Sequence, residues 1–114
     1  MAANPEYKAY VLDQLAPLGP VTARAMFGGA GIYLDGVMFA LITRADVLYF
    51  RTGDANRGEY ENAEMGPFVT SKPKGTVMPY HEVPLDVIED SDEMCDWGRQ
   101  AWDVAAAAKA RKKK

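Results

Sequence analysis

The sequence is poor in several residue types that mark common protein classes. It holds one cysteine, Cys95, and one histidine, His81, among 114 residues. A single cysteine cannot form an internal disulfide, which excludes a disulfide-stabilised scaffold. No spacing typical of metal ligands surrounds either residue, so we expect no metal site.

Long apolar runs are also absent. The longest unbroken stretch of aliphatic or aromatic residues is 37–42, whereas a membrane-spanning helix needs about twenty. Residues 1–13 show no charged segment followed by an apolar one, so no signal peptide is visible. By elimination we expect a cytoplasmic protein without a membrane segment.

Basic residues are scarce outside the last six positions. Lys109, Arg111 and residues 112–114 supply five of the thirteen basic residues, so residues 1–108 carry eight basic and sixteen acidic residues, a net of −8. A body this acidic repels nucleic acid. The remaining composition, 48% hydrophobic and 25% charged, is ordinary for one globular domain.

The pattern along the chain predicts helices at both ends with strands between them. Asn4 and Pro5 mark a helix start, and Gly19-Pro20 marks its stop. Asp54 can cap a short second helix, and Asp90 caps the last helix. Short turns such as Asp35-Gly36 require antiparallel pairing. Helices are predicted at 5–18, 55–64 and 91–110, with one turn at 84–88, and strands at 21–27, 32–34, 37–43, 47–51, 68–71 and 76–80.

These elements predict an α+β fold with two layers. A mainly antiparallel sheet of about five or six strands should carry its helices on one face. Residues 5–108 form the single domain, and residues 109–114 are a basic tail.

The glycine cluster at 28–31 invites comparison with phosphate-binding loops. Such loops open a helix or end in Gly-Lys-Ser or Gly-Lys-Thr, but here another strand follows the glycines. A tight turn or bulge that only glycine fits is the commoner explanation. Close backbone approach by a ligand or partner is the alternative.

Catalytic groups are hard to find. A Cys95–His81 pair is conceivable, but Cys95 lies beside the apolar stripe of the last helix, where a structural thiol is common. The seven acidic residues between 82 and 96 suit the start of that helix. We therefore expect no enzyme and no cofactor.

Several segments resemble the TfoX N-terminal domain family, in one consistent order over residues 5–108. They are Arg24 to Ile42 with its Met-Phe-Gly-Gly core, Leu48 to Arg51, Tyr80 to Pro84, Val87 to Asp90, and Trp97 to Ala107. The resemblance implies a two-layer α+β domain linked to natural competence, through transcription of DNA-uptake genes. Family members are thought to work with a cyclic-AMP-responsive activator rather than as enzymes, so no catalytic residue is carried over.

The full-length competence regulators have a second, helical domain, and residues 109–114 leave no room for one. A stand-alone N-terminal domain is therefore expected, acting as a non-enzymatic regulatory or protein-interaction domain. Its partner would be a protein, for example of the transcription machinery, or a second copy of the chain. An exposed apolar patch holding Phe27, Tyr33 or Tyr49 would favour this role. The family motif, read as fold-defining first and as a partner surface second, comprises Met26, Phe27, Gly28, Gly29, Gly31, Tyr33, Gly36 and Phe39.

Two alternatives belong to other classes. One is small-molecule binding near the glycine-rich turn and His81, which would need a pocket holding both. The other is direct nucleic-acid binding. Its candidate residues are Arg24, Lys72, Lys74, Lys109, Arg111, Lys112, Lys113 and Lys114.

Overall fold

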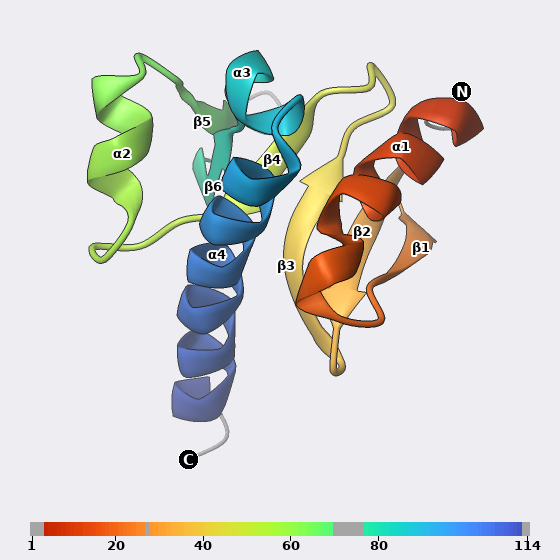
Figure 1. The fold of residues 1–114 in the computed structure, drawn as a ribbon. Coiled ribbons are helices and arrows are strands. Elements are labelled where there is room, and N and C mark those ends of the chain that lie inside the picture. The colour runs from red at the N-terminus through yellow and green to blue at the C-terminus, as the bar shows by residue number, and fades with distance from the viewer. Residues whose placement is uncertain (1–3, 27, 70–76, 113–114) are drawn as a thin grey trace.

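The computed structural model describes residues 4–26, 28–69 and 77–112, and its centre is one sheet (Figure 1). Six strands lie in the order β1-β2-β3-β4-β6-β5, and every neighbouring pair is antiparallel. The strands are β1 (Thr22–Met26), β2 (Gly29–Leu34), β3 (Val37–Ile42), β4 (Leu48–Arg51), β5 (Pro67–Val69) and β6 (Val77–Glu82).

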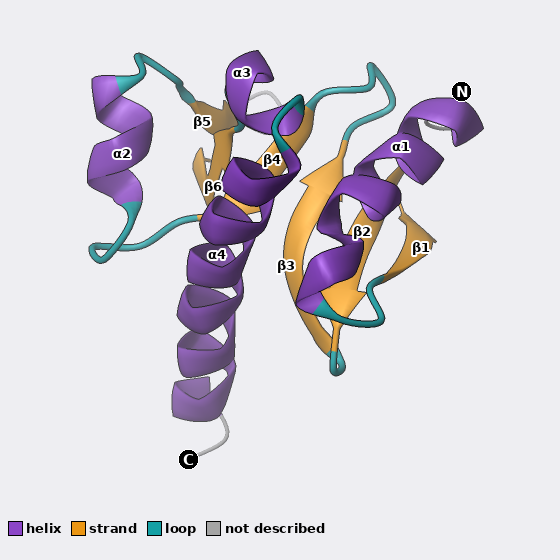
Figure 2. Cartoon of the chain, viewed as in Figure 1, coloured by secondary structure: helices purple, strands orange, loops and turns teal. Residues whose placement is uncertain are grey.

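The helices form the second layer. They are α1 (Pro5–Leu15) with the short 3-10 turn η1 (Ala16–Leu18), α2 (Arg57–Asn62), α3 (Leu85–Ile88) and α4 (Ser91–Lys112). Helices α1, α3 and α4 lie over the same side of the sheet, and α2 stands beside β5 and β6 (Figure 2). This arrangement confirms the predicted two-layer α+β fold with helices on one face.

The predicted helix starts are present at both ends of the chain. The Asn4 side chain accepts from the backbone N–H of Glu6 at 2.8 Å. The Asp90 carboxylate accepts from Asp92 N at 3.0 Å and from Glu93 N at 3.2 Å. Each cap satisfies N–H groups that have no partner within the helix. The last helix continues through the first basic residues of the tail, to Lys112.

Helix α2 begins differently from the prediction that Asp54 caps it. The Asp54 carboxylate instead pairs with the guanidinium of Arg57. Asn56 precedes the helix without a side-chain cap. Its buried amide accepts from Gly53 N at 2.8 Å and donates to Arg51 O at 3.0 Å. Local bonding to the end of β4 therefore fixes where α2 starts.

The glycines between β1 and β3 have two roles: some form turns, and others lie within a strand. Asp35 and Gly36 have φ of +52° and +77°, as a type I′ turn requires. Gly28, with φ +82°, is a turn residue, whereas Gly29 and Gly31 belong to β2. The strand thus starts three residues before the predicted position at Ile32, because glycine in a strand hides the alternation on which the prediction rests.

The core lies between the sheet and the helices. Phe39 and Phe50 are fully buried with ring centroids 6.1 Å apart. Trp102 of α4 donates its indole N–H to the carbonyl of Leu34 at 2.8 Å, which ties the long helix to β2. Among the helices of the described residues, none is long and apolar enough to cross a membrane.

Candidate functional site: the open face of the sheet

The sheet has one face turned toward the helices and one turned away. Residues paired across antiparallel strands share a face, and the buried residues Ile32, Ala40 and Phe50 are paired in series on the helix side. The other side, which no described helix covers (Figure 2), is called the open face here. By register, alternation and contact, its members include Arg24, Met26, Gly31, Tyr33, Met38, Leu41, Tyr49, Arg51, Phe68, Tyr80 and Glu82.

Gly31 forms the floor of a methionine cluster on this face. A Cβ at Gly31 would lie 2.8 Å from the Sδ atoms of both Met26 and Met38, and 3.3 Å from a ring carbon of Tyr33. The absent side chain therefore lets two thioethers and one phenol ring pack flat against β2. Methionine is flexible and polarizable, which suits surfaces that adapt to a partner.

Two arginines lie over tyrosine rings on the same face. The guanidinium carbon of Arg24 is 5.7 Å from the centroid of Tyr33, and that of Arg51 is 5.8 Å from the centroid of Tyr80. Neither arginine has a carboxylate within 4.0 Å among the described residues, which include every Asp and Glu of the chain. The open face thus presents cations held by aromatic rings rather than by acids.

The remaining aromatic side chains extend this surface across β4, β5 and β6. Tyr49 packs against Phe68 with ring centroids 4.9 Å apart. Burial raises the pKa of Tyr49, with the Glu82 carboxylate as a second cause. Burial also raises the pKa of Tyr80, although Arg51 opposes the shift. Both phenols stay neutral near pH 7. Tyr80 is only 5% exposed, so Tyr49 is the one of the two that a partner can contact.

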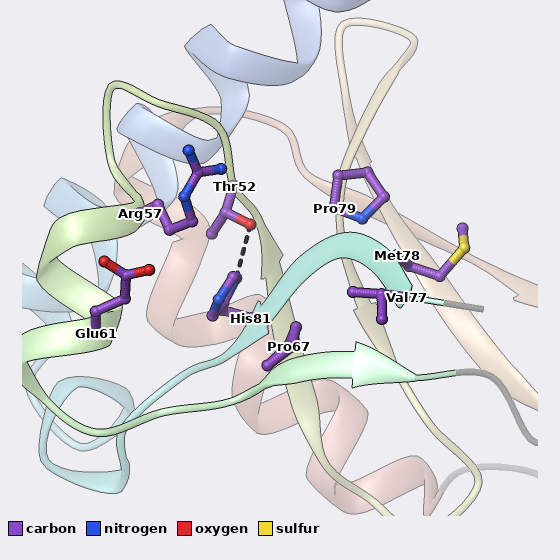
Figure 3. Close-up of a pocket in the computed structure, with 8 residues that line it drawn as sticks. All are labelled: Thr52, Arg57, Glu61, Pro67, Val77, Met78, Pro79 and His81. Atoms are coloured by element: carbon purple, nitrogen blue, oxygen red, sulfur yellow. Dashed lines mark hydrogen bonds between the residues drawn. The ribbon is translucent and has the colours of Figure 1, made fainter. Parts of the chain in front are cut away.

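His81 lies on the other side of the sheet, in an open cleft of about 460 Å³. Its Nδ1 and the Thr52 hydroxyl are 2.8 Å apart, and burial lowers its pKa. Arg57 and Glu61 of α2 flank the cleft (Figure 3). The buried ring of Tyr60, whose hydroxyl has no hydrogen-bond partner among the described residues, lies 5.7 Å from the His81 ring.

The structure does not bring His81 and the glycine cluster together. His81 is paired with Phe50 on the helix side, whereas Gly31 lies on the open face, and three strand spacings separate β2 from β6. None of the glycines lines the cleft. Cys95 lies on α4, apart from both His81 and the glycines. Its thiol donates to the carbonyl of Gln14 in α1 at 3.3 Å, and burial raises the pKa of the thiol.

The other motif residues have structural positions. Phe39 is core and Gly36 is in the β2–β3 turn. Gly29 packs so closely that a Cβ there would overlap the carbonyl oxygen of Ile42. Phe27 lies outside the described residues.

The basic residues proposed to contact nucleic acid do not form one surface. Arg24 is on the open face, but Lys109 and Arg111 are on α4 in the helix layer. Lys109 donates to the carbonyl of Gly36 at 3.0 Å, and Arg111 is exposed. Lys72, Lys74, Lys113, Lys114 and the side chain of Lys112 lie outside what the structure describes.

The motif left out most of the open-face residues named above: Arg24, Met38, Leu41, Tyr49, Arg51, Phe68, Tyr80 and Glu82. Alternation in 48–51 does assign Tyr49 and Arg51 to one face, because Leu48 and Phe50 occupy the other. The register that sets them beside Met38 and Tyr80 is a property of pairing between strands. Within the described residues, no group of three or more His, Cys, Asp or Glu is placed to hold a metal ion.

Comparison with known proteins gives this architecture a family. The model of the TfoX N-terminal domain matches residues 13–105. The chain is also similar to a protein of Spirochaeta aurantia described as an uncharacterized 12.7 kDa protein in the trpE 5' region. The two are 31% identical over 115 residues, which cover 100% of this chain and 93% of that protein. The matched region holds all six strands and most of α4, and the chain belongs to the TfoX N-terminal domain family.

Proposed function

We propose that this chain is a non-enzymatic regulatory domain that binds a protein partner through the open face of its sheet. The observation that carries the proposal is the composition of that face. Tyrosine, methionine and arginine are enriched at protein interfaces, and tyrosine and arginine dominate their energetic hot spots. Among the described residues no helix covers this face, and a surface with grouped, partly exposed apolar side chains is the kind that marks an interaction site.

The burial of individual side chains supports the same role. Tyr33, Leu41 and Tyr49 are only half-buried, so they are not part of the core between sheet and helices. From the sequence we expect that exposure of Phe27, Tyr33 or Tyr49 favours an interaction domain over a purely structural motif. Tyr33 and Tyr49 are both partly exposed. A partner that covers them would remove apolar surface from water.

The family supplies the first partner to test. Because the resemblance links TfoX N-terminal domains to transcription of DNA-uptake genes, we propose a protein of the transcription machinery. Direct nucleic-acid binding has less support, since residues 1–108 carry a net charge of −8 and Arg24 is separated from the basic end of α4. Small-molecule binding would rest on the His81 cleft alone, without the glycines.

The test is a nuclease-treated pull-down from the source organism with three full-length proteins. They are the wild type, Leu41→Glu on the open face, and Leu85→Glu as matched control. Leu85 lies on α3 and is 65% exposed, so it offers the same substitution in the helix layer. The proposal predicts stoichiometric recovery of one protein with the wild type and with Leu85→Glu, and its loss with Leu41→Glu. Recovery unaffected by Leu41→Glu would refute it.

A further inference from the structure

We propose that the partner segment is acidic: its carboxylates pair with Arg24 and Arg51 while apolar side chains between them rest on the cluster of Met26, Met38 and Tyr33. This inference rests on the proposed function and specifies the chemistry of the partner. It follows from the charges, the packing and the spacing on the open face.

Tyrosine side chains orient the two guanidiniums. Arg24 and Arg51 lie over the rings of Tyr33 and Tyr80 at 5.7 and 5.8 Å. A cation above a ring engages the π-face of the ring and leaves N–H donors for other groups. The fork of a guanidinium matches a carboxylate bidentately. The chain itself places no carboxylate within 4.0 Å of either arginine among the described residues.

The charge of the open face is opposite to that of the surrounding domain. Among the described residues, Arg24 and Arg51 are its cations and Glu82 is its anion, in a body of residues 1–108 with a net charge of −8. An acidic segment is therefore repelled by most of that body, and it is attracted to the open face and to the basic end of α4. Such complementarity fixes where and in which register a partner docks.

The methionine cluster supplies the apolar part of the site. Because Gly31 has no Cβ, the Sδ atoms of Met26 and Met38 sit directly over β2. Each thioether is on a side chain that can change rotamer at low cost. The cluster can thus accept leucine-like or aromatic groups without a preformed pocket.

The distance between the arginines sets the spacing of the partner's acids. β1 and β4 are separated by three strand spacings, about 14 Å at roughly 4.8 Å each. Arg24 is in register with Tyr49 through Gly31 and Leu41. Arg51 lies two residues beyond Tyr49, and this offset adds about 7 Å along the strand. The resulting separation is about 16 Å, or roughly five residues of an extended chain.

A single-stranded nucleic acid is the competing partner class, because bases also stack on tyrosine. The open face disfavours it for two reasons. Its two arginines offer few contacts for a continuous phosphate backbone, and Glu82 together with the acidic body repels that backbone. An acidic protein segment needs only the two cations that are present.

A peptide-display selection on the immobilised full-length chain tests the inference, followed by fluorescence anisotropy with the selected peptides. We expect peptides with two Asp or Glu residues about five positions apart and apolar residues between them. The double variant Arg24→Gln/Arg51→Gln should weaken their binding by about tenfold or more. Arg99→Gln should leave it within about twofold, since Arg99 lies 5.9 Å over the Trp102 ring in the helix layer and is the matched control.

The outcomes separate this inference from the proposed function. Peptides without acidic residues whose binding is lost with Leu41→Glu would overturn the acidic partner but keep the open face as the docking surface. Peptides that bind Leu41→Glu and the wild type equally would overturn both. A fifteen-nucleotide oligothymidine that binds through Arg24 and Arg51, with no acidic peptide selected, would overturn the inference in favour of nucleic acid.

Discussion

The closest backbone packing in the sheet predicts that Gly29→Ala severely destabilises the protein. A Cβ at Gly29 would overlap the carbonyl oxygen of Ile42 on the neighbouring strand β3. Because that atom is backbone, the overlap is relieved only by moving β2 away from β3. The movement costs overpacking strain of about 1–3 kcal/mol and leaves at least one buried ladder group without its partner, about 1–3 kcal/mol more.

The sum, roughly 2–6 kcal/mol, is a large part of the roughly 5–15 kcal/mol that stabilises a typical domain. The assay is urea unfolding followed by circular dichroism and tryptophan fluorescence. Gly31→Ala is the matched comparison, because its Cβ meets the thioethers of Met26 and Met38, which can swing aside, and should cost only about 1 kcal/mol. A Gly29→Ala protein within about 1 kcal/mol of the wild type would refute the close-approach explanation of the glycine motif.

Three further predictions concern stability. Gly58→Ala in α2, where nothing lies within 4 Å, should raise the free energy of unfolding by about 0.5–1 kcal/mol; a decrease in the same urea assay would contradict it. Trp102→Phe removes the donor to the Leu34 carbonyl and should cost about 1–3 kcal/mol; an unchanged urea midpoint would argue against that tether. Burial lowers the pKa of His81 in the folded state, so the unfolded state binds the proton first, and stability is lost as the pH falls through about 6.5. Urea unfolding between pH 7.5 and 5.5 should show a smaller loss for His81→Gln, and equal losses would contradict the assignment.

Much of the fold follows from local signals in the sequence. The cap at Asn4, the Gly19-Pro20 stop and the Asp35-Gly36 turn each specify a boundary through backbone chemistry that depends on a few neighbouring residues. Antiparallel pairing follows from the short connections. These signals correctly predict the two-layer architecture.

The position of Gly29 and Gly31 within β2 could not be predicted in the same way. Glycine contributes no side chain to a period-2 pattern, and its need for space is set by Ile42, Met26 and Met38 on other strands. The predicted start of α2 at residue 55 was wrong for a related reason. Asp54 is a good capping residue in sequence, but its carboxylate pairs with Arg57.

The open face depends on register across four or more strands. Alternation assigns Tyr49 and Arg51 to one side of β4, yet only pairing reveals that Tyr80 and Glu82 share that side. The same pairing assigns His81 to the helix side, away from Gly31. A sequence motif can therefore mark the strand on which a surface is built without revealing the surface.

Site-specific photo-cross-linking in cells shows whether a partner docks on the open face. A benzophenone side chain replaces either Tyr49 on the open face or Tyr10 on α1, which is 41% exposed in the helix layer. We expect a covalent adduct with one defined protein from position 49 and none from position 10. An adduct from position 10 alone, or no adduct from position 49, would contradict it.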